Sequence, residues 1–278
     1  MSATTAGRVR RTDIGRRIST GLSIAAIVLA SVATVQTFTA VVLIITIGSL
    51  WELGAMTARK GQPLVFPVGA LAIGTYVILA ALGKQHAYEK TVLAATVFGA
   101  LAFSLVGDRQ NYIARSANTL FGVVYIGWLG SYFLALRNLP HVGMGFTFAA
   151  IVVIAFTDIF AMIVGTTLGK TPLTSISPNK TWEGAIGGFV ASVAIGSAMG
   201  AIPALGISWL DGVIVGAITS IAAQAGDIVE SALKRDARVK DASNLLAGHG
   251  GILDRFDSYI FGGIAFYTTL FVTGHIPH

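Results

Sequence analysis

The sequence predicts an all-α fold that spans a lipid bilayer. This prediction rests on composition, on a row of apolar segments and on the placement of positive charges. Of the 278 residues, 54% are hydrophobic and only 12% are charged, which is too apolar for a soluble domain of this length. The chain contains no cysteine, so disulfides, thiolate metal sites and cysteine nucleophiles are excluded.

Nine apolar segments are long enough to cross a membrane, since a spanning helix needs about 20 mainly apolar residues. Only Gln36 and Thr37 separate the first two segments, so this pair can also be interpreted as a helical hairpin that crosses only partly. In chain order the helices are predicted at 18–36, 38–58, 64–83, 88–107, 117–136, 143–168, 184–205, 208–229 and 256–275.

These helices divide into two transmembrane regions behind a basic tail. The tail covers 1–17, and about five helices follow within 18–142. The C-terminal region covers 143–278 and carries polar loops at 169–183 and 230–255. Most other connections are shorter, and long loops on a compact scaffold are usually functional or disordered.

Lysine and arginine are distributed unevenly between the two sides of this arrangement. If the N-terminus is cytoplasmic, 16 of the 19 basic residues lie inside, and only Lys84, Lys90 and Arg137 lie outside. This is the positive-inside pattern of membrane proteins, and it explains the isoelectric point near 9.7 without a nucleic-acid partner. The five arginines between 8 and 17 also resemble the start of a cleavable secretory signal. That alternative is less favoured because a second apolar segment follows immediately.

The loop at 230–255 is preceded by a stripe of polar residues at the end of an apolar helix. Asp227, Glu230, Ser231 and Lys234 are spaced i, i+3, i+4 and i+7, so they share one helix face. A charged side chain inside a membrane normally faces a partner, a cavity or a metal. Asp227 is therefore a candidate ligand, and the alternative that it simply pairs with Lys234 at the helix end remains open.

Asp254 and Asp257 stand three residues apart at the start of the last apolar segment, so a helical turn there places both on one face. Helix capping is the common use of such acids. His249, Gly250 and Gly251 come directly before them, and glycines let the backbone approach an anion and present its N–H groups. The pattern favours a site for a phosphate and a divalent cation within one turn.

Positive charges surround these acids. Mg²⁺ takes carboxylate oxygens and is completed by substrate phosphates, and Lys and Arg would neutralise the remaining phosphate charge. A solvated basic loop attracted to anionic lipids is the alternative. The cations are Lys234, Arg235, Arg238, Lys240 and Arg255.

The loop at 169–183 has a second polar cluster. Ser177, Lys180 and Thr181 would suit a phosphate at headgroup level. Equally, Thr181 can be an ordinary helix N-cap with Trp182 at the membrane interface. Two more acids, Asp158 and Glu52, lie inside apolar segments and are candidates for a site or for an interhelical hydrogen bond, with Glu52 the weaker candidate.

The C-terminal residues resemble a known family. The stretches Ser231-Ala-Leu-Lys-Arg, Lys240-Asp241 and Gly248-His-Gly-Gly-Ile-Leu-Asp-Arg-Phe-Asp257 closely resemble the signature of the phosphatidate cytidylyltransferases. The stretches 157–161 and 176–184 are similar to two further family segments. The resemblance runs from Asp158 to the C-terminus, and the first half resembles the family only as a series of apolar helices. Ala247 stands where the family usually has proline, which loosens the turn but removes no ligand.

This resemblance implies condensation of CTP with phosphatidic acid to give CDP-diacylglycerol and pyrophosphate. It implies a multi-pass enzyme of the cell membrane with its active site facing the cytoplasm, and a catalytic role for the region 143–278. It also implies a divalent cation, typically Mg²⁺, together with a monovalent cation such as K⁺, and a homodimer among membrane lipids.

The resemblance also distributes roles among the candidate residues. Asp227, Asp254 and Asp257 are the expected metal ligands, and Lys240 and Asp241 are further catalytic candidates. Ser177, Lys180 and Thr181 would hold the lipid phosphate. The remaining substrate-binding candidates are Ser231, Lys234, Arg235, His249, Gly250, Gly251 and Arg255.

Other functions remain open at the level of sequence. The same chemistry can serve another lipid phosphate, or a CTP-dependent phosphorylation of a lipid alcohol. A transporter of anionic solutes could also use buried acids and cytoplasmic cations, although paired broken helices are not evident. A CDP-alcohol phosphotransferase is disfavoured because Asp211-Gly212 is not followed by that family's D-G-x-x-A-R pattern.

Overall fold

The computed structural model describes residues 20–106, 111–243, 245–246 and 250–276. Every regular element within these ranges is a helix, which confirms the predicted all-α fold. The elements are Thr20–Ser31, α2 Val35–Arg59, α3 Phe66–Ala81, α4 Gln85–Ser104, α5 Tyr112–Gly122, the π-helix η2 Val123–Trp128, α6 Leu129–Arg137, α7 Gly143–Leu168, α8 Trp182–Met199, the 3₁₀ turn η3 Pro203–Leu205, α9 Trp209–Asp236 and α10 Leu253–Val272.

Five helical stretches in the described ranges are long and apolar enough to cross a bilayer. They are Val35–Arg59, Tyr112–Arg137, Gly143–Leu168, Trp182–Met199 and Trp209–Asp236. The stretch Tyr112–Arg137 joins α5, η2 and α6 into one continuous rod. The chain is thus built as a membrane protein, and the count of nine crossings stays a prediction.

The first predicted boundary is displaced. The turn between the first two helices lies at 32–34, a few residues before the predicted break at Gln36 and Thr37. The Thr34 side chain accepts a hydrogen bond from the Thr37 N–H at 3.1 Å, so Thr34 is the N-cap of α2. A capping hydroxyl marks the start of a helix, which hydropathy alone does not reveal.

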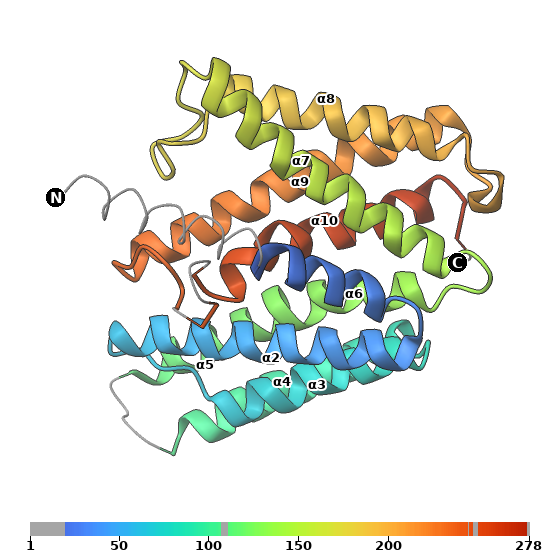
Figure 1. Ribbon diagram of the computed structural model, residues 1–278. Helices are drawn as coiled ribbons and strands as arrows, with labels where there is room; N and C mark the ends of the chain where they lie inside the picture. The colour runs from blue at the N-terminus through green and yellow to red at the C-terminus, as the bar shows by residue number, and fades with distance from the viewer. Residues whose placement is uncertain (1–19, 107–110, 244, 247–249, 277–278) are drawn as a thin grey trace, which may run out of the picture.

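Helix α10 lies at the centre of the arrangement (Figure 1). It packs against α9 on one side and contacts α6, α7 and α2. Helices α7, α8 and α9 pack against one another, while α2 to α5 form the other part of the molecule. Because α10 touches both parts, its first turn receives side chains from widely separated regions of the sequence.

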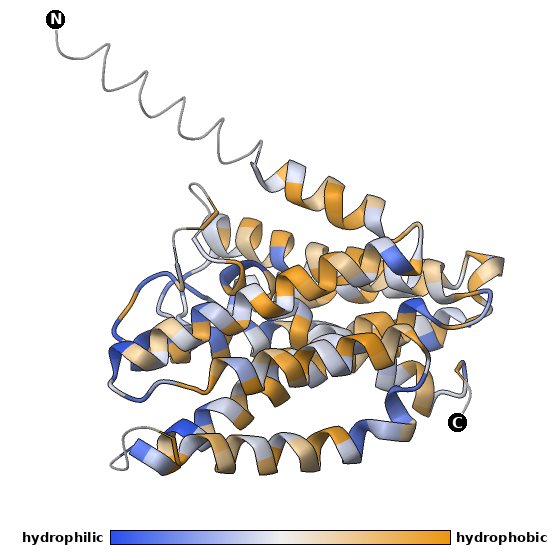
Figure 2. Cartoon of the chain, turned by 90° about the horizontal axis from the view of Figure 1, so that it is seen from below, coloured by the Kyte–Doolittle hydropathy of each residue, from blue (hydrophilic) through white to orange (hydrophobic). Residues whose placement is uncertain are grey.

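The ends that the charge distribution assigns to the cytoplasm lie together. In Figure 1 the last turns of α2, α4, α7 and α9 and the first turns of α3, α5, α8 and α10 are all on the left. Figure 2 shows hydrophilic residues gathered toward the ends of the helices and mostly apolar or neutral residues between them. The two long polar loops therefore meet at one end of the bundle.

Candidate functional site

Three carboxylates from two helices converge at this end of the bundle. Asp227 and Glu230 on α9 and Asp257 on α10 each place one oxygen within 4.8 Å of the others. Glu230 is 1% exposed and Asp257 is 6% exposed. Gly226 makes this approach possible, since a Cβ there would lie 2.6 Å from the Asp257 carbonyl oxygen. The close contact of α9 and α10 thus creates a largely buried acidic cluster.

Lys234 joins this cluster to the start of α10. Its Nζ lies 2.7 Å from Glu230 Oε2 and 2.7 Å from Asp254 Oδ1. Within the described part of the chain, both Glu230 oxygens are buried without a hydrogen-bond partner, and Oε2 has only its ion pair with Lys234. One ammonium group is therefore shared by two carboxylates, and Glu230 keeps buried acceptor capacity for a ligand.

Asp254 also holds the loop that precedes α10. Its Oδ2 accepts hydrogen bonds from the N–H groups of Ala242 at 2.9 Å and Gly251 at 2.7 Å. Gly250 has a φ of +78°, and a Cβ there would lie 2.7 Å from Asp254 Oδ2. The glycine pair therefore does let the backbone approach an anion, but the anion in contact with it is Asp254. The predicted role of Asp254 as a metal ligand stays a prediction.

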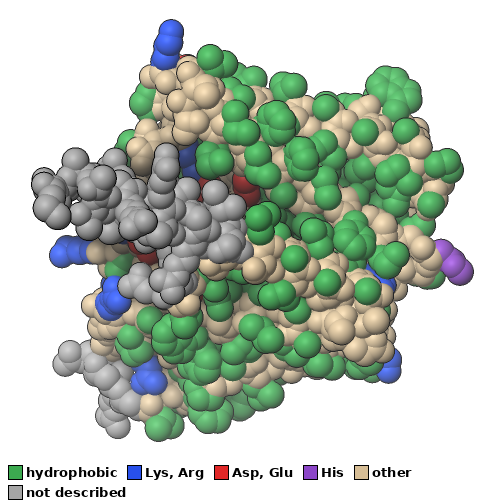
Figure 3. Space-filling view, in the orientation of Figure 1, with side chains coloured by type: hydrophobic (Ala, Val, Ile, Leu, Met, Phe, Trp, Pro, Cys, Tyr) green, Lys and Arg blue, Asp and Glu red, His purple; other side chains and the backbone are tan. Residues whose placement is uncertain are grey.

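A polar cavity of about 320 Å³ lies beside the acidic cluster and shares Asp227 with it. Lys180, from the loop between α7 and α8, forms an ion pair with Asp227. Figure 3 shows Asp and Glu atoms recessed between hydrophobic side chains on one face of the molecule. The polar residues of the lining are Asp158, Thr166, Asn179, Lys180, Thr181, Gln224 and Asp227.

The α7–α8 loop is fixed by hydrogen bonds that hold Lys180 at this cavity. Glu183 accepts from the Thr171 hydroxyl at 3.0 Å, and the Leu173 N–H donates to the Lys180 carbonyl at 2.7 Å. Thr181 accepts from the Gly184 N–H at 3.1 Å and is the N-cap of α8. The capping interpretation of Thr181 is therefore confirmed, and the same residue also lines the cavity.

Asp158 belongs to the same electrostatic neighbourhood. Its Oδ1 accepts from the Ser258 hydroxyl at 3.3 Å, and it interacts with the charges of Asp227 and Lys180. This region thus contains five carboxyl groups and two lysine ammonium groups. They belong to Asp158, Asp227, Glu230, Asp254, Asp257, Lys180 and Lys234. An excess of carboxylate oxygens in a partly buried place is the donor set of a hard divalent cation. The residues present fit such an ion.

Other predicted site residues lie around this centre. Arg235 is exposed, and its Nε donates to the Ile176 carbonyl at 3.5 Å. Ser177 accepts from the Lys180 N–H through its backbone at 3.0 Å. Lys240, Asp241 and Arg255 are exposed, whereas Ser231 on α9 is half-buried. His249 lies outside the described residues.

Glu230 belongs to the acidic cluster, which the sequence did not predict. The sequence places it only on the polar face of α9. Its i, i+3 spacing from Asp227 was the available signal. What the spacing could not show is that Glu230 is buried and faces Asp257 on another helix.

Tyr125 is the second missed residue, and it lies on the π-helix η2. Its side chain is 3% exposed, and its ring contacts Phe121 and Phe261 with centroid distances of 5.4 Å and 5.9 Å. The hydroxyl has no hydrogen-bond partner among the described residues, and Asp257, Glu230 and Asp227 lie close enough to act on it electrostatically. Short π-helices are frequent at functional sites. The sequence around Tyr125 is apolar and carries no such signal.

Comparisons with known proteins agree with this picture. The model of the cytidylyltransferase family matches residues 15–273. A phosphatidate cytidylyltransferase of Bacillus subtilis is 35% identical over 261 residues, which is 90% of this chain and 94% of the relative. A chloroplastic phosphatidate cytidylyltransferase of Arabidopsis thaliana is 37% identical over 64% of this chain and 51% of its own. One from Synechocystis is 35% identical over 57% of this chain and 63% of its own.

Proposed function

The chain belongs to the cytidylyltransferase family, and we infer from this membership that it transfers the cytidylyl group of CTP to phosphatidic acid. The products are CDP-diacylglycerol and pyrophosphate, and the reaction is a step of phospholipid synthesis. The structural observation that best supports this function is the position of Asp227. It is one member of the acidic cluster and also lines the polar cavity beside Lys180.

The acidic cluster suits one divalent cation, and we assign it to Asp227, Glu230 and Asp257. Mg²⁺ is the ion that best matches an all-oxygen donor set completed by phosphates and water. When bound, such a cation supplies charge neutralisation for the nucleotide phosphates. The predicted ligand Asp254 has both oxygens engaged by Lys234 and the loop. We therefore place Asp254 outside the immediate ligands, where it fixes Lys234.

The polar cavity is the proposed place of the lipid phosphate. Lys180 and Thr181 line it, and Ser177 forms the turn that presents Lys180. The exposed Arg235, Lys240 and Arg255 would supply positive charge for the triphosphate. Ser231 and Asp241, with the loop His249, Gly250 and Gly251, complete the proposed nucleotide side of the site. A lipid substrate would thus reach the site from the bilayer, and a soluble nucleotide from water.

The transfer is an in-line displacement. An oxygen of the lipid phosphate forms a bond to the α-phosphorus of CTP, while the bond from that phosphorus to the bridging oxygen breaks. Pyrophosphate leaves with the electron pair. Because the attacking oxygen is already anionic near neutral pH, no strong general base is needed, and the task of the chain is positioning and charge neutralisation. Lys180 would release Asp227 in part and turn to the lipid phosphate.

Membrane orientation and assembly complete the proposal. We place the N-terminus, the loops at 169–183 and 230–255 and the active site in the cytoplasm, with nine crossings in total. The uneven distribution of Lys and Arg and the gathering of these loops at one end support this topology. A homodimer is proposed on family resemblance. The exposed apolar side chains of α7 and α8 offer a face for lipid or a second copy.

The test is pyrophosphate release by purified protein in detergent with phosphatidic acid, Mg²⁺ and each of the four nucleoside triphosphates in turn. We expect release only with CTP, lipid and metal together, and CDP-diacylglycerol as the product. EDTA and lipid-free reactions are the controls. Release that does not depend on the lipid, or a preference for another nucleotide, would overturn the assignment.

A further inference from the structure

We propose that Glu52 on α2 is a positioning residue that sets the first turn of α10, and with it Asp254 and Asp257. Glu52 accepts hydrogen bonds from the N–H groups of Ile252 at 2.8 Å and Leu253 at 2.7 Å. The Ser243 hydroxyl donates to the same carboxylate at 2.5 Å. Only the activity measurements below rest on the proposed function.

Glu52 is fully buried in the apolar helix α2. A carboxylate in such a place is costly unless several donors compensate it. The first N–H groups of a helix have no partner within the helix and carry partial positive charge. Glu52 therefore replaces the missing N-cap of α10, since Ile252 at that position makes no side-chain capping bond.

The backbone is shaped to admit this carboxylate. A Cβ on Gly251 would lie 2.6 Å from both Glu52 oxygens, so only glycine leaves room for them. One turn earlier in α2, a Cβ on Gly48 would lie 2.5 Å from Ile252 Cδ1. The segment that leads into α10 thus lies close to α2 at two successive positions.

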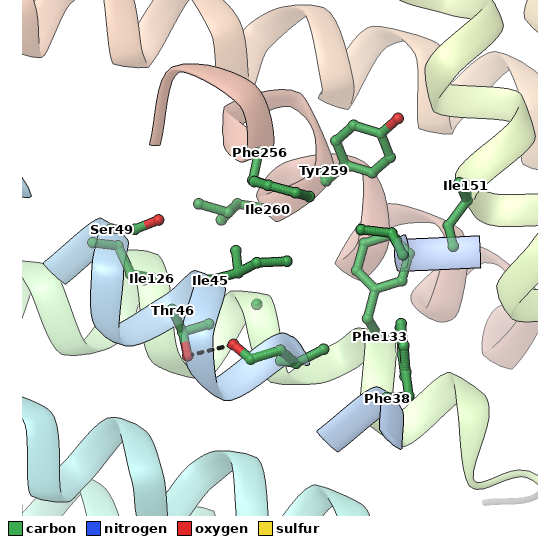
Figure 4. A pocket seen from close by; sticks show the side chains of 13 residues that line it. Phe38, Ile45, Thr46, Ser49, Ile126, Phe133, Ile151, Phe256, Tyr259 and Ile260 are labelled. Carbon is green, nitrogen blue, oxygen red and sulfur yellow. Dashed lines mark hydrogen bonds between the residues drawn. The ribbon is translucent and has the colours of Figure 1, made fainter. Parts of the chain in front are cut away.

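The surroundings strengthen these hydrogen bonds. An apolar cavity of about 60 Å³ reaches α2 at Ser49, three residues before Glu52, and Figure 4 shows Ser49, Phe256 and Ile260 among its lining residues. The Thr46 hydroxyl already donates to the Val42 carbonyl at 2.7 Å. A bound water needs two to four polar partners, roughly, and this lining does not offer them. Because Glu52 is itself fully buried, its hydrogen bonds lie in a low-dielectric interior, where they are stronger than in water.

The same loop is held by two carboxylates. Asp254 binds the N–H groups of Ala242 and Gly251, and Glu52 binds the next two N–H groups along the chain. Asp254 follows Leu253 directly, and Asp257 lies one turn later. A shift of this turn would move Asp257 relative to Asp227 and Glu230 and open the acidic cluster.

The experiment compares Glu52→Gln with Ser49→Ala in the full-length protein. Ser49 is also buried in α2, and its hydroxyl has no partner among the described residues, so it is a matched control. Glutamine keeps the size of the side chain but turns one acceptor into a donor facing N–H groups. We expect a fall in kcat of about tenfold or more and a severalfold rise in the Mg²⁺ concentration for half-maximal activity. Ser49→Ala should match the wild type.

Hydrogen exchange of the peptide covering 250–256 gives a readout that needs no activity. Glu52→Gln should speed its exchange by about tenfold or more, because the N–H groups of Ile252 and Leu253 lose their acceptor. If Glu52→Gln does not fold, Ser243→Ala removes one of the three donors and should give a smaller change in the same direction.

The outcomes separate this inference from the proposed function. A Glu52→Gln protein with wild-type kcat, Mg²⁺ dependence and exchange would overturn the positioning role. So would a variant whose thermal stability alone falls, because a purely structural residue would leave kcat per folded molecule unchanged. If the wild-type protein does not transfer the cytidylyl group, the proposed function is wrong. The hydrogen-exchange result would still decide whether Glu52 holds α10.

Discussion

Lys180 on the α7–α8 loop is ion-paired with Asp227 on α9, and this contact joins the proposed lipid-phosphate cavity to the acidic cluster. The ammonium group thus has a carboxylate partner before any substrate arrives. A phosphate that enters the cavity would compete with Asp227 for Lys180. The pair therefore couples lipid binding to the charge of the acidic cluster.

The first prediction concerns the positive charge of Lys180. Lys180→Met should lower kcat/KM for phosphatidic acid by about ten- to a hundredfold, because a hydrogen bond to a charged group contributes about 1.5–3 kcal/mol. Lys180→Arg keeps the charge and should retain more activity. The measurement is the initial rate against the mole fraction of phosphatidic acid in mixed micelles. Equal rates for Lys180→Met and the wild type would remove Lys180 from the site.

The second prediction concerns Glu230, the buried carboxylate of the acidic cluster. Glu230→Gln should lower kcat by about a hundredfold and raise the Mg²⁺ requirement, because it removes one charge from the proposed ligands. Asp236→Asn is a suitable control, since Asp236 is exposed near the end of the same helix and pairs with Lys60. The measurement is the activity of both variants as a function of Mg²⁺ concentration. An unchanged Mg²⁺ requirement in folded Glu230→Gln would exclude Glu230 as a ligand.

The third prediction concerns Asp254, which joins Lys234 to the loop before α10. Asp254→Asn should abolish turnover while the protein stays folded. An asparagine cannot accept from both the loop N–H groups and Lys234, and each unsatisfied buried donor costs about 1–3 kcal/mol. We therefore also expect faster hydrogen exchange around Ala242, measured by mass spectrometry. Normal activity in a folded Asp254→Asn protein would contradict every role assigned to Asp254.

The fourth prediction concerns Tyr125, whose hydroxyl has no hydrogen-bond partner in the part of the chain that the structure describes. Tyr125→Phe removes only this oxygen, and loss of a buried hydroxyl without a partner is neutral or stabilising. We expect an unchanged or higher melting temperature. We also expect kcat to fall by about three- to tenfold, because the variant would lose one neutral hydrogen bond to a ligand. A variant with full activity would show that the hydroxyl does not contact substrate or metal-bound water.

Much of the fold was predictable because hydropathy reports on helices directly. Helix α7 was predicted at 143–168 and is observed as Gly143–Leu168. Hydropathy does not report on changes within a continuous apolar stretch, so the π-helix at Val123–Trp128 was not foreseen. A π-helix depends on one extra residue in a turn, which leaves the apolar pattern intact.

The candidate site was predictable where its residues are close in sequence. Asp227, Lys234, Asp254 and Asp257 fall within one short stretch, and the structure brings them together. Partners from other helices were harder to identify. Glu52 is 201 residues from Leu253 in sequence, and a lone buried acid gives no indication of which helix it caps. Distances across a helical bundle are decided by packing, which no local pattern encodes.

The last prediction tests the contact between Glu52 and Gly251 by changing the glycine instead of the carboxylate. Gly251→Ala would place a methyl group 2.6 Å from both Glu52 oxygens, which is far inside van der Waals contact. Either the Glu52 carboxylate or the loop must move, and both movements break the hydrogen bonds of Glu52 with Ile252 and Leu253. Gly74→Ala on α3 is the control, since a Cβ there meets nothing within 4 Å.

We expect Gly251→Ala to reproduce the losses of Glu52→Gln in kcat and in Mg²⁺ dependence, whereas Gly74→Ala should be active and slightly stabilised. The double variant of Gly251→Ala with Glu52→Gln should be no worse than the poorer single variant, because both changes break one contact. Additive losses in kcat would show that the glycine acts elsewhere, for example by direct approach to a phosphate. The kcat values of the two single variants and the double variant therefore distinguish a carboxylate that shapes the loop from a loop that binds the nucleotide by itself.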